Sequence, residues 1–265
     1  MEDYKSNNCK GCSKVDNEKI DIFRFIQNLD SFFRTNDLNG AGDYLRYWEN
    51  EAKALSDKAG LLTVLNEEIG YFRRTGDREQ ALRVVKETKE LLQNDEIKNT
   101  PSGAVIYINT ATTLSAFGKA SEGIPLYEQA EKVYSDHGLE GTFEFASLLN
   151  NKATALSNLK QYDEAEKCIE RAIGVLKKEG KHDGEIAVSL VNLAHLIFNR
   201  DSTAYEQVES TLDLAWEYIN SPRQPHDANF AFIISKCAPS YRYFKRELEA
   251  EALESVAAEI YGGKQ

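Results

Sequence analysis

The sequence lacks the features of secreted, membrane and disulfide-linked proteins. No stretch of its 265 residues approaches the roughly 18 consecutive apolar residues of a membrane span. The opening residues, MEDYKSNNCKGCSKVDNEK, have no apolar core of the kind a secretory signal contains. These absences predict a cytoplasmic protein with no membrane segment, and in that compartment disulfides among the four cysteines are not expected.

Motifs for metal binding and catalysis are absent or incomplete. Cys9 and Cys12 have the spacing of half a zinc site or of a redox pair, but no second CxxC and no HxxxH accompanies them. The simpler interpretation is a disordered polar tail that carries two thiols. The sequence contains no HExxH, no GxSxG and no phosphate-binding glycine loop. We therefore expect no catalytic residues, no metal and no cofactor, and a protein that is not an enzyme.

Basic residues are too few for a nucleic-acid-binding protein. The chain has 32 lysines and arginines against 43 acidic residues, for a net charge of −11. Proteins that bind a phosphate backbone need a basic face, so nucleic acid is not an expected partner.

A repeat of about 42 residues occupies most of the chain. Four segments align, at residues 76–88, 118–130, 160–172 and 245–257, and two weaker copies complete a set of six. Each copy has a small or short residue in the same slot: Ala41, Ala81, Gly123, Ala165, Val208 and Ala250. Apolar residues recur at intervals of three and four within each copy, which predicts two amphipathic helices per repeat.

The repeat resembles the tetratricopeptide family. The residues that match the family signature are Ala153, Leu156, Tyr162, Ala165, Ile169 and Ala172. The segment LLNNKATALSNLKQYDEAEKCIERAI is similar to a kinesin light chain repeat, and the period exceeds the usual 34 residues, which suggests longer helices. The resemblance implies an all-α, right-handed superhelical solenoid of about six antiparallel helix pairs. We expect a disordered tail at 1–16, the array at 17–261 and a short tail at 262–265.

In this family the first helix of each pair lines the concave side of the array. Asn109, Asn151 and Asn192 each lie two residues before a small residue of a first helix, so they form a ladder on one face. Asparagines at this slot hold peptide main chain in kinesin light chains and in the glucosaminyl transferase of the same repeat class. Alternatively, these amides bond to the neighbouring helix and set the pitch of the superhelix.

The rest of the predicted groove is polar at its centre and charged at its ends. Its predicted binding residues, besides the ladder, are Asn150, Thr112, Thr154, His195, Asn199, Arg73, Arg74, Lys236 and Arg242. Five cations, including Arg34, against Asp30 and Glu67 give this groove an excess of about three positive charges. Ligands with acidic side chains or a free carboxylate are therefore favoured. The alternative is that these cations are simply solvated.

These observations predict a non-catalytic scaffold that binds a peptide or protein in its concave groove. One alternative is a bacterial-type peptide-sensing regulator that acts through protein contacts. Another is a structural homo-oligomer, because the final helix has no capping helix behind it. Leu253, Val256 and Ile260 of that helix are candidates either for covering the last repeat alone or for pairing two copies through it.

Overall fold

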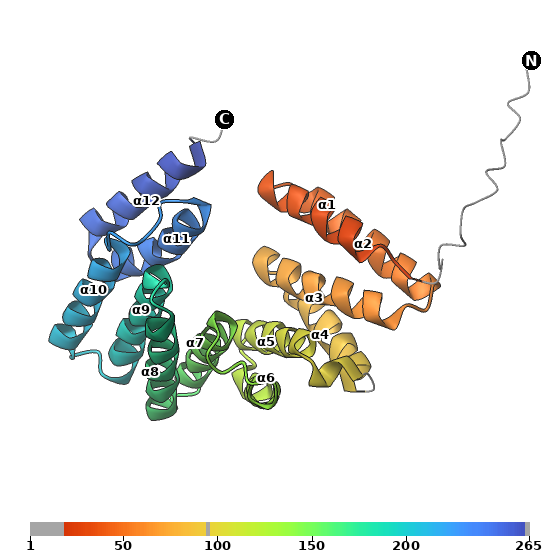
Figure 1. The fold of residues 1–265 in the computed structure, drawn as a ribbon, viewed down its shortest axis with the longest axis horizontal. Helices are drawn as coiled ribbons and strands as arrows, with labels where there is room; N and C mark the ends of the chain where they lie inside the picture. Colours follow the sequence, from red (N-terminus) through yellow and green to blue (C-terminus); the bar gives the residue numbers. More distant parts are fainter. Residues whose placement is uncertain (1–18, 94–95, 263–265) are drawn as a thin grey trace, which may run out of the picture. The chain divides into compact units, whose positions relative to one another are not determined.

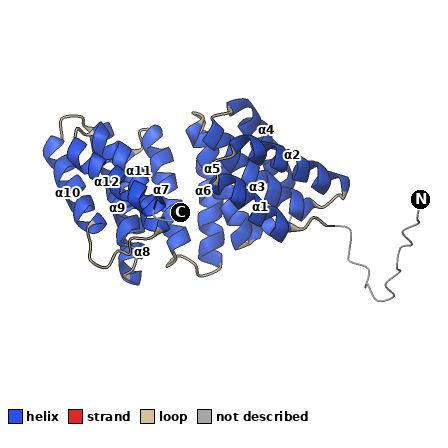
Figure 2. Cartoon of the chain, turned by 90° about the horizontal axis from the view of Figure 1, so that it is seen from above, coloured by secondary structure: helices blue, strands red, loops and turns tan. Residues whose placement is uncertain are grey.

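The computed structural model describes residues 19–93 and 96–262, and every regular element in these ranges is a helix (Figures 1 and 2). The elements are α1 (Ile22–Arg34), α2 (Leu38–Ala54), α3 (Lys58–Thr75), α4 (Arg78–Gln93), the 3₁₀ helix η1 (Glu96–Asn99), α5 (Pro101–Ala116), α6 (Ala120–Asp136), α7 (Phe143–Asn158), α8 (Tyr162–Glu179), α9 (Asp183–Arg200), α10 (Tyr205–Ile219), α11 (Ala228–Tyr243) and α12 (Glu247–Gly262). The predicted all-α fold of six helix pairs is confirmed. Cys9, Cys12 and the predicted tail at 1–16 lie outside the described residues.

The chain divides into two compact units. The first ends at residue 95 and contains α1 to α4, and the second begins at residue 96 and contains η1 and α5 to α12. A cluster of buried apolar side chains runs through the second unit from Ala104 to Ala257. The four helix pairs of that unit therefore share a continuous interior.

Local sequence fixes where three first helices of the second unit, α5, α7 and α11, begin. Thr100, Thr142 and Asp227 each accept a hydrogen bond from the backbone N–H three residues further on, at 3.2, 3.3 and 3.0 Å. Such caps satisfy N–H groups that have no partner within the helix. Gly118, with φ of 79°, lies in the turn after α5, and Lys160, with φ of 62°, lies in the turn after α7. Left-handed backbone at these points turns the chain into the second helix of each pair.

The repeated small residues lie where the two helices of a pair cross. In all six pairs the predicted slot is the fourth residue of the second helix, and its occupant is buried. The closest approach is at Gly123 on α6, where an added Cβ would lie 2.9 Å from the carbonyl oxygen of Ala111 on α5. The absence of a side chain at this slot therefore allows the two backbones to meet.

Charged side chains of the first unit meet between α2, α3 and α4. Arg83 lies 3.2 Å from Glu49 and 3.6 Å from Glu68, and Lys53 lies 2.7 Å from both Glu49 and Glu87. Glu68 is only 2% exposed. The pKa of Glu68 is raised to about 8, chiefly because the carboxyl group is buried and secondly because the Glu49 carboxylate is close, while Arg83 opposes both effects. At pH 7 the Glu68 carboxyl group is therefore mostly protonated.

The final helix packs into the core of the second unit. Leu253 is 3% exposed, while Val256 and Ile260 are half-buried against the same apolar cluster. These three side chains already have intramolecular partners. A dimer through α12 would have to use its other face, where Leu248 is 80% exposed.

No helix within residues 19–93 and 96–262 combines the length and the apolar character needed to cross a membrane.

Candidate functional site

The first helices of successive pairs are joined by hydrogen bonds between polar side chains. Asn150 Nδ2 donates to Ser189 Oγ at 2.8 Å, and Asn199 Nδ2 donates to Ser157 Oγ at 3.4 Å. Both bonds connect α7 with α9. Since the residue numbers rise together along the two helices, α7 and α9 run parallel. These contacts hold the two neighbouring pairs in register.

The same kind of contact connects α7 to α5 and α9 to α11. Asn158 Nδ2 donates to Ser115 Oγ at 3.3 Å, and His195 Nε2 lies 3.0 Å from Ser240 Oγ. The His195 ring also packs on Phe244, with centroids 4.8 Å apart. Burial lowers the pKa of His195, so the imidazole is neutral at pH 7. Neutral side chains thus link all four first helices of this unit.

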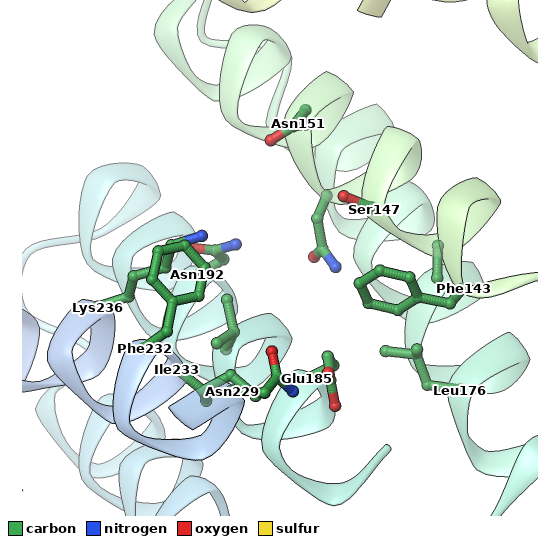
Figure 3. Close-up of a pocket in the computed structure, with 13 residues that line it drawn as sticks. Phe143, Ser147, Asn151, Leu176, Glu185, Asn192, Asn229, Phe232, Ile233 and Lys236 are labelled. Carbon is green, nitrogen blue, oxygen red and sulfur yellow. The ribbon is translucent and has the colours of Figure 1, made fainter. Parts of the chain in front are cut away.

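A pocket of about 160 Å³ lies where α7, α9 and α11 meet (Figure 3). Phe143 and Phe232, which are 38% and 52% exposed, line it from different helices. We call it the phenylalanine pocket, and its lining consists of Phe143, Ala146, Ser147, Asn150, Asn151, Leu176, Glu185, Val188, Asn192, Asn229, Phe232, Ile233 and Lys236. In Figure 3 the side chains of α7 face those of α9 and α11 across this space.

A second pocket, of about 240 Å³, lies further along α7 and α9. We call it the amide pocket, and it is lined by Ala153, Thr154, Ser157, Asn158, Ile169, Asn192, His195, Leu196 and Asn199. Asn192 lines both pockets. The two pockets are therefore neighbours on one surface, which changes from apolar to polar along the helix direction.

The three ladder asparagines differ in their surroundings. All three are half-exposed, and Asn151 and Asn192 line the phenylalanine pocket. Within the described part of the chain, the amides of Asn151 and Asn192 have no hydrogen-bond partner, whereas Asn109 on α5 does have an interaction partner and lines neither pocket. Lys236 occupies the equivalent slot on α11, two residues before the buried Ala238.

The remaining predicted polar residues divide into two groups. Asn150, Thr154, His195 and Asn199 line one of the two pockets. Thr112 instead faces the interior of its own pair. Its hydroxyl donates to the Ile108 carbonyl at 2.8 Å and lies 2.9 Å from the hydroxyl of Tyr127 on α6.

The predicted cations do not gather at one place. Arg34, Arg73 and Arg74 belong to the first unit, as do Asp30 and Glu67. In the second unit, Arg242 forms ion pairs of 2.7 Å with Glu247 and 2.8 Å with Glu254. Of the predicted cations in the described part of this unit, only Lys236 lines either pocket, and Glu185 brings a negative charge to the same pocket.

Sequence reasoning missed most residues that line the phenylalanine pocket, although a signal was available for six of them. These six precede the ladder slot on α7, α9 and α11 by one or two turns: Phe143 and Ser147, then Glu185 and Val188, then Asn229 and Phe232. Residues three, four, seven and eight apart share one helix face. Counting backwards from Asn151, Asn192 and Lys236 would have found them.

The start of α9 is fixed by the segment before α11. Arg223 Nη2 and Nε donate to the buried carboxylate of Asp183 at 2.8 and 3.1 Å, and Ser221 donates to the same carboxylate. The Gly184 N–H donates to Gln224 Oε1 at 2.9 Å. Because these bonds tie the first turn of α9 to the approach to α11, they determine how the two helices flank the phenylalanine pocket.

No group of three or more His, Cys, Asp or Glu side chains in the described ranges is placed to hold a metal ion. The two described cysteines, Cys168 and Cys237, are free and buried, and burial raises the pKa of each thiol. The chemistry that the two pockets offer is hydrogen bonding by amides and contact with apolar side chains.

Comparisons with known proteins agree with this architecture. Residues 146–175 match the family model of the tetratricopeptide repeat. Over 102 residues the chain is 30% identical to the RxLR effector protein SFI4 of Phytophthora infestans (strain T30-4), a match that covers 38% of this chain and 30% of the effector.

Two solved structures are similar to most of this chain. A kinesin-light-chain protein from Podosopora anserina with nearly identical TPR-like repeats is 16% identical, covers 77% of this chain and 96% of its own, and has a TM-score of 0.51. BtubC (BKLC) from P. vanneervenii is 18% identical, with coverage of 90% and 91% and a TM-score of 0.49. The described helices form a tetratricopeptide-like repeat array, and residues 146–175 carry the tetratricopeptide repeat itself.

Proposed function

We propose that the protein is a non-catalytic scaffold that binds an extended peptide segment of a partner along the surface formed by the phenylalanine and amide pockets. The observation that carries this proposal is the pair of amides at Asn151 and Asn192. Both line the phenylalanine pocket, Asn192 also lines the amide pocket, and neither has a hydrogen-bond partner among the described residues. A side-chain amide offers donors and an acceptor together, which matches the alternating N–H and C=O groups of a peptide main chain.

The dimensions of the surface fit a short peptide. Phe143 at one end and Asn158 at the other are separated by 15 residues of α7. At about 1.5 Å per residue this is a length of about 22 Å. An extended chain advances about 3.4 Å per residue, so the surface accommodates about six residues.

The charge of the pocket supports a ligand that carries one carboxylate. Lys236 is the cation at this surface, and a side-chain or terminal carboxylate of the ligand would pair with it. The basic groove predicted from the sequence has less support, because Arg242 is already paired and Glu185 offsets Lys236 within the pocket. Cys168 and Cys237 are free thiols, and free thiols are typical of proteins in a reducing compartment such as the cytoplasm.

The test is a double replacement, Asn151→Ala with Asn192→Ala, in the full-length chain. Each net hydrogen bond is worth about 0.5 to 1.5 kcal/mol, so loss of two weakens peptide binding by about 5-fold to about 150-fold. Thermal unfolding should hardly change, because neither amide holds a neighbouring helix. The probe is a library of acetylated, amidated hexapeptides passed over the immobilised protein, and retained peptides are then titrated by fluorescence anisotropy.

Asn109→Ala is the matched control, because Asn109 has the same slot on α5 but lines neither pocket. We expect this variant to bind as the unmodified protein does. Equal affinity of the double variant and the unmodified protein for every retained peptide would contradict the proposed binding surface. A double variant that unfolds at markedly lower temperature would instead assign the two amides to helix stacking.

A further inference from the structure

The first unit contains a polar pocket of its own, which the proposed peptide-binding surface does not use. It lies between α2, α3 and α4 and has a volume of about 440 Å³. We call it the carboxyl pocket, because Glu49, Glu68 and Asp77 all line it. A pocket of this size with several polar groups around it is large enough for a small polar ligand.

Glu68 brings a polar atom without a hydrogen-bond partner to the carboxyl pocket. Its side chain is only 2% exposed, and within residues 19–93 and 96–262 no group donates to or accepts from its Oε2. Arg83 Nη2 lies 3.6 Å away, which is too far for a hydrogen bond. A buried carboxyl oxygen left unpaired costs free energy, so a hydrogen-bond donor supplied by a ligand would be stabilised here.

The buried cation of the pocket is already engaged. Arg83 Nε donates to Gln80 Oε1 at 2.9 Å, and its Nη1 donates to Glu49 at 3.2 Å and to Glu87 at 3.3 Å. An anionic ligand would have to compete with these carboxylates for Arg83. A donor placed at Glu68 Oε2 would displace no existing hydrogen bond, so the pocket favours a donor.

Two aromatic rings in the lining also favour a cation. Tyr71 and Phe72 pack edge to face, with centroids 5.1 Å apart, and the Tyr71 hydroxyl donates to the Leu38 carbonyl at 2.9 Å. An added Cβ at Gly42 would lie 2.5 Å from this hydroxyl, so the missing side chain lets Tyr71 reach α2. Aromatic faces attract ammonium groups. Arg46 lines the pocket as well, but its side chain is 73% exposed, so water screens its charge.

The charges of the lining cancel while Glu68 is protonated. Arg46 and Arg83 are then balanced by the carboxylates of Glu49 and Asp77. The other titratable groups that line the pocket or pair with its lining are Tyr71, Lys53, Glu87 and the exposed Asp43. A cation that enters as Glu68 releases its proton leaves this balance unchanged. An anion would add a negative charge beside buried carboxyl groups, which is unfavourable.

We propose that the carboxyl pocket binds the ammonium group of an alkyl amine against Glu68 Oε2, and that binding releases the proton of Glu68. The ammonium group keeps its three protons and donates one hydrogen bond, the Glu68 proton passes to solvent, and no covalent bond forms between ligand and protein. The alkyl part lies near Tyr71 and Phe72. The amine can be a free small molecule or a lysine side chain of another protein, since both present the same group. This inference is independent of the proposed peptide binding.

Proton release gives this binding a characteristic dependence on pH. The pKa of Glu68 in the free protein is raised to about 8, chiefly because the group is buried. Below that pH the ligand must displace a bound proton, and the lower the pH the more this costs. The affinity should therefore rise by nearly 10-fold for each pH unit up to about 8 and level off above it, where Glu68 has already ionised.

The experiment titrates the full-length protein with butylammonium chloride at pH 6, 7 and 8, at constant chloride concentration, and follows the backbone amides of α2 to α4 by NMR. We expect saturable shifts confined to the residues around the pocket, and an affinity that rises by about 50-fold from pH 6 to pH 8. Uncharged butan-1-ol and the anion butanoate are the matched probes. Neither should saturate the pocket at concentrations where butylammonium does.

Two protein variants assign the released proton. Glu68→Gln should weaken binding and remove its dependence on pH. Glu79→Gln is the matched control, because Glu79 is an exposed carboxylate of α4 that does not line the pocket, and this variant should bind as the unmodified protein does. Circular dichroism checks the helix content of both. If Glu68→Gln fails to fold, the pH profile of the unmodified protein still decides.

A further probe identifies the source of the amine. Nα-acetyl-lysinamide carries the ammonium group on a peptide unit, and an affinity within about 10-fold of that of butylammonium would support a lysine side chain as the ligand. Much weaker binding of this probe would support a free small amine.

Several results would overturn the inference. Butylammonium that binds equally at pH 6 and pH 8, or a pH dependence that persists in Glu68→Gln, would exclude exchange with the Glu68 proton. Butan-1-ol or butanoate binding as tightly as butylammonium would exclude a cation site. The absence of saturable shifts at pH 8 would mean that the pocket holds no amine.

Discussion

Replacing Gly123 by alanine should destabilise the second unit, although the same replacement at Gly174 should stabilise it. Both glycines lie within helices, where alanine is favoured over glycine by about 0.5 to 1 kcal/mol. At Gly174 an added Cβ would meet no atom within 4 Å, so only this gain is expected. At Gly123 the added Cβ would lie 2.9 Å from the oxygen and 3.4 Å from the Cα of Ala111, which are backbone atoms of α5.

The size of the effect follows from comparing the two sites. Backbone atoms cannot rotate away, so α5 and α6 must separate to admit the methyl group, and overpacking of this kind costs about 1 to 3 kcal/mol. The helix-propensity gain is the same at both glycines and cancels in the comparison. The free energy of unfolding of Gly123→Ala should therefore be about 1 to 3 kcal/mol below that of Gly174→Ala.

The two tryptophans allow the unfolding of each unit to be measured separately. Trp48 lies on α2 in the first unit and Trp216 lies on α10 in the second. In a Trp48→Phe background, urea unfolding monitored by Trp216 fluorescence gives the free energies by linear extrapolation. Circular dichroism confirms that both variants retain their helices. Equal stability of the Gly123 and Gly174 variants would mean that the small-residue slot is not a close crossing, and the packing derived from the repeat would be wrong.

Further predictions concern pH and the start of α9. Because Glu68 keeps its proton up to about pH 8 in the folded protein but ionises near 4.5 when unfolded, the first unit should lose stability as pH rises from about 4.5 through about 8. Glu68→Gln should abolish this slope, measured by Trp48 fluorescence in a Trp216→Phe background between pH 5 and 9; an unaltered slope would mean that another group titrates. Asp183→Asn should lower the stability of the second unit by about 1 to 3 kcal/mol, since it weakens charged hydrogen bonds from Arg223. Unfolding curves that coincide with those of the unmodified protein would show that the bond to Arg223 contributes little.

The parts of the fold that could be predicted are those that local sequence determines. Helix crossings exclude large side chains, so the sequence repeats a small residue wherever two backbones meet, as at Ala81, Gly123 and Ala165. The ladder slot likewise follows from helix geometry, and two of its three predicted members, Asn151 and Asn192, line one pocket.

Side-chain partners could not be read from spacing. Thr112 has the periodicity of a groove residue, but its hydroxyl pairs with Tyr127 on the second helix of its own pair. Arg242 was counted as a groove cation, yet it pairs with Glu247 and Glu254, which come from the following helix. A long side chain can reach partners on more than one adjacent helix, and periodicity indicates only which face of its own helix carries it. The charge of this surface therefore does not follow from periodicity alone.

The adjacent asparagines Asn150 and Asn151 show why residue type alone does not determine role. Consecutive residues of an α-helix point about 100° apart, at 3.6 residues per turn. Asn150 consequently reaches across to Ser189 on α9 and joins two repeats, while Asn151 is directed along the open surface with its amide unpaired among the described residues. On α9 the two asparagines share one face, two turns apart, and differ in their partners: Asn192 lines both pockets, while Asn199, which also lines the amide pocket, donates to Ser157. A count of asparagines in such a groove overstates its capacity to bind main chain, because the amides that fix the spacing of the repeats have already used their donors.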